Sequence, residues 1–535
     1  MKDLRRCALL VPVALWAAGM VMLFHPILFS RFEMTLAGLG DVRLVNFMLE
    51  HSYRWLIGNH LHADFWSPPV FFPHRNVAAY SELVIGAAAP YWLLRAFDLQ
   101  PVTSYLLWVL ITWSLNFVAS WLLLRRIFGL GVVGASLGAF LVAFGNPRSA
   151  NIAHQHLAPF YYVIAAVAAV VVVFGDGQAG RLRRRVWIGV FGVAVALQAY
   201  TAFYPLFFLG LSLLVAGIWA IALPDARRRL LEVARRDGWA IAGVGVVTLA
   251  ALVPVMSHYL RAAAEVGMRA IEPEFLPRPA SWVLMGRWHP LYGWLQEPGG
   301  PFAELRESVH THGVGPVTTV LAITGLVQAW RWRSVRLMVF TVITLILATT
   351  MFPGGFSGWR LLHAYVPGAA ALRAVGRIGA VTVLPLALGV AVFFDRLTER
   401  RSKLLLVALA VVMVAEQNHE LRFRDRASLL AYEESLVAQL EPGCETFLLV
   451  YTGNRPYPHV HDDAAWVTLR AGIPTINGRY GNYPPDYGLY DVHAPNPEAA
   501  AGVRRGLDDW IRRNGLSAPR VCWIETSGLT GGRGQ

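Results

Sequence analysis

The sequence predicts an α-helical polytopic membrane protein with a small C-terminal α/β domain. The 535 residues are 56% hydrophobic and 15% charged, and apolar runs long enough to cross a hydrocarbon layer of roughly 30 Å recur along the chain. After about residue 417 the composition changes to mixed polar and apolar segments. The formal net charge of +13 does not indicate nucleic-acid binding, because the arginines cluster in short links between apolar runs, as orientation in a bilayer requires.

The basic links define the topology, because cytoplasmic loops accumulate Lys and Arg. They are Lys2–Arg6, Arg125–Arg126, Arg181–Arg185, Arg227–Arg236, Arg331–Arg336 and Arg396–Lys403. Placing all of them inside predicts about eleven spans, with the N-terminus cytoplasmic and the C-terminus outside. The spans lie near residues 8–29, 102–124, 131–146, 157–174, 186–202, 204–223, 239–259, 314–330, 335–352, 378–395 and 403–416. The first is too long for a signal peptide and lacks a convincing cleavage site, so we expect it to stay as an anchor.

Residues 82–97 decide the parity of this topology. If they spanned the membrane, Arg125 and Arg126 would lie outside and every later loop would be inverted. The segment is short and contains Pro90 and Arg95. We interpret it as a helix at the outer interface, with a short transmembrane helix as the alternative.

Two domains follow from this layout. Residues 1–416 form the transmembrane domain, with a long first outer loop at 30–100, and residues 417–535 form a soluble extracytoplasmic α/β domain. The runs TFLLVY and VCWIE predict strands, and VRRGLDDWIRRNG predicts an amphipathic helix. Cys444 and Cys522 lie beside the two strands, and outside the cytoplasm they could form a disulfide. A pair of buried free cysteines is the alternative.

The segment GLGDVRLVNFMLEH, at the exit of the first span, carries the main catalytic candidate, Asp41. A carboxylate at the membrane surface, partly desolvated and near a cation such as Arg43, can accept a proton from a hydroxyl nucleophile. Its spacing predicts a surface helix with Asp41 at its N-terminal end. The apolar face would hold Val42, Val45, Leu49, Tyr53 and Leu56, and the polar face Arg43, Asn46, Glu50 and Arg54. A simple N-cap role for Asp41 is the alternative, and the two roles are compatible.

Further binding candidates lie in the outer loops. In the first loop they are Arg43, Glu50 and Asp64. His60, His62 and Asp64 alternate on a strand-like segment, so a divalent metal ion is a candidate ligand there, with interfacial hydrogen bonding as the competing interpretation.

Later outer segments add basic groups. Arg148, His154 and His156 could grip a phosphate or sugar hydroxyls, although one arginine beside a membrane end is commonly a headgroup anchor. Arg373 and Arg377 face outward against the usual bias, which makes them candidates for a lipid phosphate; headgroup or structural pairing is the alternative. In the C-terminal domain, residues 473–488 offer Asn, Arg and Tyr groups of the kind that contact sugars, or form an ordered turn.

With these features together, residues 1–416 resemble the GT-C superfamily of membrane glycosyltransferases. The resemblance rests on the acid in GLGDVR, the aromatic and proline-rich FWSPPVFFP before an interfacial helix, and the second span ending in LLLRRIFG. It implies an inverting transferase that takes a sugar from a polyprenyl-phosphate carrier to a hydroxyl of a glycan, lipid or protein, with Asp41 as general base. Val42 stands where some members carry a second acid, so metal dependence stays open, and Glu50 or Asp64 could substitute.

Other functional classes remain. A lipid or glycan transporter or flippase would explain the spans, although these are mostly plain Ala, Val and Leu without buried ionisable groups. A non-catalytic scaffold of cell-envelope glycan assembly is a third class, and an O-antigen ligase-like enzyme, using outer Arg and His, is a nearer variant. The expected location is a bacterial inner membrane, with membrane lipids as partners and no nucleic acid.

Overall fold

The computed structural model describes residues 2–175, 180–305, 308–399, 403–455 and 457–529. Part of the predicted link at 396–403, residues 400–402, lies outside the described residues. The chain divides into two compact units. The helical unit comprises residues 1–25, 109–253 and 268–421, and the mixed unit comprises residues 26–108, 254–267 and 422–535.

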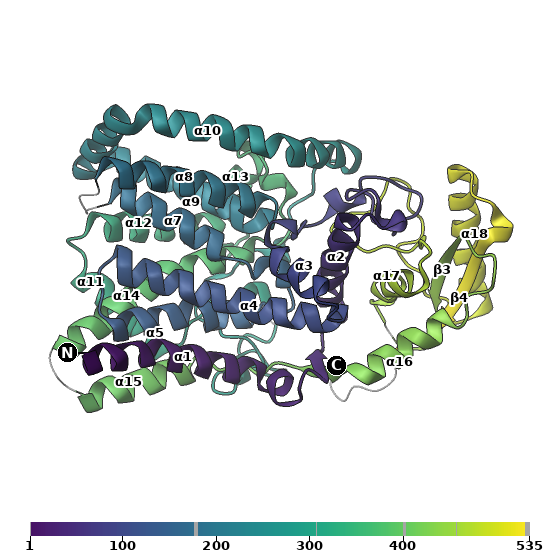
Figure 1. The fold of residues 1–535 in the computed structure, drawn as a ribbon, viewed down its shortest axis with the longest axis horizontal. Coiled ribbons are helices and arrows are strands. Elements are labelled where there is room, and N and C mark those ends of the chain that lie inside the picture. Colours follow the sequence, from purple (N-terminus) through teal and green to yellow (C-terminus); the bar gives the residue numbers. More distant parts are fainter. Residues whose placement is uncertain (1, 176–179, 306–307, 400–402, 456, 530–535) are drawn as a thin grey trace. The chain divides into compact units, whose positions relative to one another are not determined.

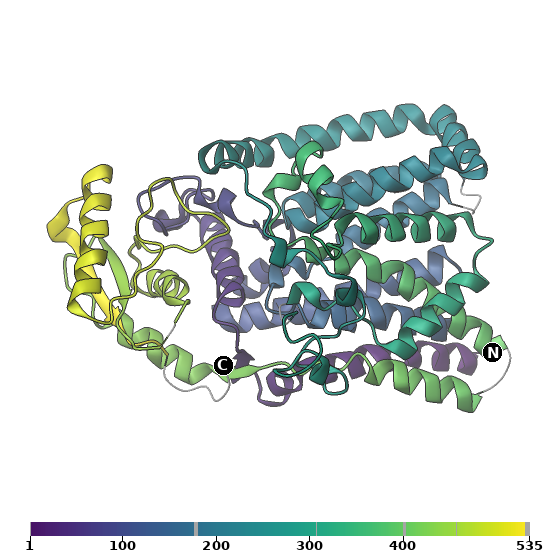
Figure 2. The same cartoon turned by 180° about the vertical axis from the view of Figure 1, so that it is seen from behind.

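Long helices build the helical unit, and Figures 1 and 2 show them lying side by side. Each of the eleven predicted spans coincides with a helix. These helices are α1 (Lys2–Phe29), α4 (Pro101–Leu122), α5 (Val132–Phe144), α7 (Tyr161–Phe174), α8 (Arg181–Ala199), α9 (Phe203–Ala222), α10 (Pro224–Val266), α11 (Pro316–Gln328), α12 (Arg333–Thr349), α14 (Gly379–Glu399) and α15 (Lys403–Ala415). The shorter α6 (Asn146–Ser149) and α13 (Trp359–Tyr365) lie in the connections.

Length and composition separate these helices. Among the described residues, six helical segments are long and apolar enough to cross a membrane, while α11 and α15 are apolar but shorter. The segment at 82–97 forms a 3-10 turn and then α3 (Ala89–Ala96), whose eight residues extend about 12 Å. Because a span needs roughly 30 Å, α3 is too short to cross, which favours the interfacial interpretation.

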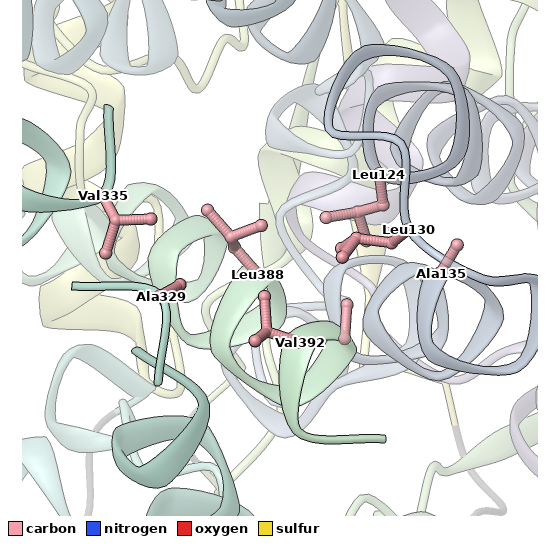
Figure 3. Packing of buried hydrophobic residues seen from close by; sticks show 8 residues of the cluster. Leu124, Leu130, Ala135, Ala329, Val335, Leu388 and Val392 are labelled. Atoms are coloured by element: carbon pink, nitrogen blue, oxygen red, sulfur yellow. The ribbon is translucent and has the colours of Figure 1, made fainter. Parts of the chain in front are cut away.

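The core of the helical unit is centred on α14. Figure 3 shows Leu388 and Val392 of α14 lying between Leu124, Leu130 and Ala135 on one side and Ala329 and Val335 on the other. All of these side chains are buried.

Small residues let α14 approach its neighbours closely. A Cβ on Gly325 of α11 would lie 1.8 Å from the Gly389 carbonyl oxygen, and one on Gly134 of α5 would lie 2.2 Å from the Ala391 carbonyl oxygen. Membrane helices pack through such small residues because lipid provides no hydrophobic force between them.

The mixed unit joins the first outer loop to the C-terminal part of the chain. β1 (Met34–Leu36) pairs antiparallel with β2 (Phe423–Asp425), and α2 (Asp41–Leu56) packs against α17 (Val460–Ala471). The predicted division placed the loop at 30–100 with the transmembrane domain, whereas the compact units group it with the C-terminal part. Backbone pairing across nearly four hundred residues of sequence explains the grouping, and no local pattern reveals it.

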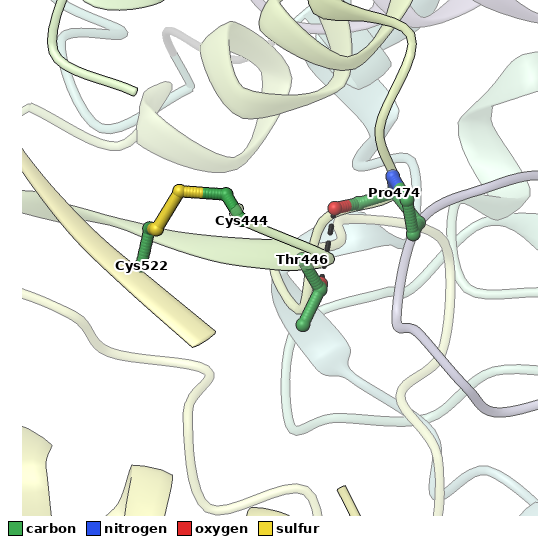
Figure 4. Close-up of a disulfide and its surroundings, with 4 residues drawn as sticks. All are labelled: Cys444, Thr446, Pro474 and Cys522. Atoms are coloured by element: carbon green, nitrogen blue, oxygen red, sulfur yellow. Dashed lines mark hydrogen bonds between the residues drawn. A yellow bond between two sulfur atoms is a disulfide. The ribbon is translucent and has the colours of Figure 1, made fainter. Parts of the chain in front are cut away.

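The C-terminal part has the predicted α/β character. β3 (Thr446–Tyr451) pairs in parallel with β4 (Val521–Thr526), and α16 (Arg426–Val437) and α18 (Pro497–Asn514) complete the segment. Every residue of β3 is buried, as expected for a parallel strand. A disulfide joins Cys444 to Cys522 at one end of the strand pair, with Cα atoms 5.7 Å apart (Figure 4). Of the two alternatives for these cysteines, the structure has the disulfide.

Candidate functional site

Asp41 opens helix α2 in the mixed unit. The N-cap is Gly40, which makes no side-chain cap hydrogen bond, so the helix starts with Asp41 in its first turn and not at the cap position. A negative charge there is favoured by the helix dipole. The Asp41 carboxylate also interacts electrostatically with Arg479, which comes from the C-terminal part of the same unit. The structure therefore places the candidate base at a helix start, beside the arginine of the segment 473–488, which the sequence analysis considered as a sugar contact and not as a partner of Asp41.

Arg43 belongs to a buried ion network. Its Nη2 lies 2.6 Å from the Glu433 carboxylate, its Nη1 pairs with Asp463, and its guanidinium lies over the Trp466 ring. Burial acts to lower the pKa of Arg43, but Asp463 and Glu433 outweigh it and the pKa is raised, so the cation is retained. We therefore interpret Arg43 as a residue that ties α2 to α16 and α17.

Glu50 has a similar position. Its side chain is fully buried and accepts hydrogen bonds from Arg54 Nε at 2.9 Å, Arg95 Nε at 2.8 Å and the Tyr91 hydroxyl at 2.8 Å. Arg43, Asn46 and Glu50 of the predicted polar face of α2 are thus buried by protein, whereas Arg54 is partly exposed. Amphipathic spacing identified the helix correctly, but it could not show that a second segment buries the polar face.

His60, His62 and Asp64 do not converge. Their segment is the 3-10 helix η1 (His60–His62) and not a strand, so alternate residues share no face. His62 is buried with its Nδ1 2.8 Å from His51 Nδ1, whereas Asp64 accepts from the Trp66 backbone N–H and the Ser67 hydroxyl. Among the described residues, these three side chains therefore do not form a metal-binding cluster.

A basic cavity, partly open to solvent, lies in the helical unit. Three predicted ligands line it: Arg148 from α6, His154, and Arg377 from the 3-10 helix η11 (Val375–Ile378). Two residues that the sequence analysis did not single out, Gln155 and His312, also line it. The HTHG run around His312 could have signalled it. His156 is buried next to His154, with ring centroids 5.8 Å apart, but does not line the cavity.

Arg148 is a buried cation in the wall of this cavity. Its Nε donates to the Val142 carbonyl at 3.0 Å and its Nη1 to the Ala158 carbonyl at 3.3 Å, while Nη2 is buried without a partner among the described residues. Burial lowers the pKa of Arg148 to about 10, so the guanidinium is charged at neutral pH. Burial also lowers the pKa of His312 to about 3, so this imidazole is uncharged at neutral pH. The cavity suits an anion.

The two arginines predicted to bind a lipid phosphate, Arg373 and Arg377, lie in different surroundings. Arg377 lines the basic cavity and its guanidinium carbon lies 4.3 Å from the Tyr204 ring centroid. Arg373 is about half-exposed, pairs with Glu272 at 2.9 Å and lies over the Phe275 ring, and it does not line the cavity. The spacing of four residues did not reveal which arginine faces the cavity, because the turn between them is irregular.

Comparison with known proteins bears on the fold. No family model matches the sequence, and no curated protein matches it significantly. The oligosaccharyltransferase of Archaeoglobus fulgidus in its apo form is 14% identical, with a TM-score of 0.54 over 95% of this chain and 69% of that one. The arabinofuranosyltransferase AftD from Mycobacteria is 14% identical, with a TM-score of 0.50 over 89% of this chain and 32% of that one.

A third solved structure is also similar. ArnT from Cupriavidus metallidurans bound to undecaprenyl phosphate is 13% identical, with a TM-score of 0.47 over 89% of this chain and 86% of that one. The oligosaccharyltransferase and AftD structures confirm, at the level of fold, the resemblance noted from the sequence. The chain has the GT-C fold of polytopic membrane glycosyltransferases.

Proposed function

We propose that the protein is an inverting glycosyltransferase that moves a sugar from a polyprenyl-phosphate carrier to a hydroxyl of a glycan, lipid or protein. The observation that carries this proposal is the buried, charged Arg148 in a cavity also lined by Arg377. A buried cation without an acidic partner is costly, and a bound anion offsets that cost. A phosphate ester is the anion that a carrier lipid would present, and the GT-C fold supports a transferase of this kind.

In the proposed reaction, the Asp41 carboxylate takes the proton of the acceptor hydroxyl. The hydroxyl oxygen forms a bond to the anomeric carbon as the bond from that carbon to the phosphate oxygen breaks, and the electron pair leaves with the phosphate. Attack opposite the leaving group inverts the anomeric configuration. Arg148 and Arg377 stabilise the negative charge that grows on the departing phosphate, which is where preorganised cations accelerate a reaction most.

We also propose a bacterial inner-membrane location with the reaction at the outer surface. The Cys444–Cys522 disulfide supports this, because disulfides persist in oxidising compartments outside the cytoplasm. The proposed orientation also agrees with cytoplasmic basic links, which place the N-terminus inside and the C-terminal part outside.

The proposal is tested by transfer of radiolabelled sugar from polyprenyl-phosphate donors, in membranes with matched expression of each variant. We expect Asp41→Asn to lower transfer roughly 100- to 10,000-fold, to a small residual rate, as for the loss of a general base. We expect Arg148→Gln to lower kcat/KM on the order of 100-fold or more, as for the loss of an oxyanion donor. Arg373→Gln is the matched control, since this arginine lies outside the cavity, and it should lose less than about 5-fold, the loss expected of a half-exposed ion pair.

Each alternative class has its own outcome. Equal transfer by wild type and Asp41→Asn removes Asp41 as the base. Absence of transfer with every donor, together with carrier flux that Asp41→Asn leaves unchanged, points to a transporter. A cell-envelope phenotype rescued by both Asp41→Asn and Arg148→Gln points to a non-catalytic scaffold.

A further inference from the structure

Arg479 lies in the segment 475–481 of the C-terminal part. Hydrogen bonds hold this segment to strand β3 on one side and to the first outer loop on the other. The Asn477 side chain accepts from the Leu449 backbone N–H at 2.7 Å and donates to the Leu449 carbonyl at 2.9 Å, which holds the segment to strand β3. Asn477 and Thr475 also accept backbone hydrogen bonds from Phe71 and Phe72 of the first outer loop, at 2.9 and 3.0 Å. The segment therefore has one position with respect to both β3 and the loop.

Two close approaches define where Arg479 lies. A Cβ on Gly478 would lie 2.4 Å from the Phe71 ring, so only glycine allows the segment to pass that ring. A Cβ on Gly40 would lie 2.8 Å from Arg479 Nη1, so the guanidinium reaches the backbone immediately before Asp41. The cation is thus held at the N-terminal end of α2.

The orientation of the guanidinium is set by a buried acid. Arg479 Nη1 donates to Asp462 Oδ2 at 2.7 Å, and Asp462 is almost completely buried in α17. Asp462 foremost, with Asp41 among the further causes, raises the pKa of Arg479, so the cation persists at all working pH values. An arginine fork held on one carboxylate presents a preorganised charge to a second one.

We propose that Arg479 is a positioning residue for Asp41, through which the C-terminal part completes the catalytic machinery of the first outer loop. This rests on the proposed function of Asp41 as the base. The guanidinium holds the carboxylate ionised and pointing in one direction before the acceptor arrives. Catalytic groups lose on the order of 100-fold in rate when they are misplaced by about 1 Å.

A double-mutant cycle tests this. Sugar transfer is measured for wild type, Asp41→Asn, Arg479→Gln and the double variant, with Arg512→Gln as the matched control, because Arg512 is an exposed arginine of the same part of the chain. We expect Arg479→Gln to lower kcat by about 10- to 100-fold, with KM for the donor changed less than about 3-fold. In the Asp41→Asn background the same change should lower the residual rate less than about 2-fold, because a residue that acts through Asp41 has nothing left to position.

Equal losses in both backgrounds would overturn the proposal, since a structural role is independent of Asp41. Wild-type kcat in Arg479→Gln would overturn it as well. If Arg479→Gln does not fold, the cycle is run with Arg479→Lys, which keeps the charge without the fork and should lose less than the glutamine variant, again only when Asp41 is present. Full activity of Asp41→Asn alone would instead refute the proposed function, so the two failures are distinguishable.

Discussion

Arg43 makes the strongest stability prediction, because its removal leaves a buried acid without its cation. In Arg43→Met an unbranched apolar stem is kept and the charged guanidinium is lost. Glu433 retains Arg470 at 2.6 Å, but Asp463, with a fully buried side chain, retains among the described residues only the hydroxyls of Tyr432 and Tyr457 as side-chain partners. The perturbation thus falls mainly on Asp463.

The magnitude follows from the cost of breaking a buried ion pair, about 3–5 kcal/mol when one partner is removed. A unit of 150–250 residues loses roughly 2–4 °C in Tm per kcal/mol, so the mixed unit should melt roughly 6–20 °C lower. Arg512→Met is the control, since that arginine is exposed and its ion pair with Asp509 contributes less than about 1 kcal/mol.

Thermal unfolding is measured in detergent micelles, and protease cleavage within the C-terminal part detects it. A second variant sharpens it. Asp463→Asn added to Arg43→Met removes the uncompensated charge and should recover more than half of the lost Tm. A shift in Arg43→Met no larger than that in Arg512→Met, or no recovery on adding Asp463→Asn, would refute the buried network.

The remaining predictions concern acid stability and topology. Burial lowers the pKa of His51 to about 4 and that of His62 to about 2, below the usual value near 6.5, so the unfolded chain binds more protons as pH falls from 6.5 towards 4 and stability is lost in that window. For His51 alone the loss of stability at pH 5 is about 2 kcal/mol. Between pH 7 and pH 5, Tm should therefore fall less in a His51→Gln, His62→Gln double variant than in wild type. An equal fall of Tm in both proteins would contradict the prediction. If residues 82–97 do not span the membrane, a membrane-impermeant maleimide should label Asp98→Cys in intact cells and Arg126→Cys only after the membrane is opened. Labelling of Arg126→Cys in intact cells would show that the topology is the inverse of the predicted one.

The sequence by itself determined the helices, and their orientation in the membrane stays a prediction. Apolar length and arginine placement predicted a helix at each of the eleven spans, and both strands and the helix at the end of the chain were predicted from alternation and amphipathic spacing. These signals are local, because each depends on residues close together in the chain. The acid at the start of α2 was found for the same reason.

Only the tertiary structure decided what surrounds the polar residues. Arg43 and Glu50 have the spacing of an exposed helix face, yet long-range partners bury them, and Arg479 reaches α2 from more than four hundred residues away. Arg148 and Arg377 share a cavity, whereas Arg373 does not, because irregular turns set their directions. A charge is read from sequence as a residue type, but whether it stabilises the fold or faces a ligand depends on partners that the chain brings together only when it folds.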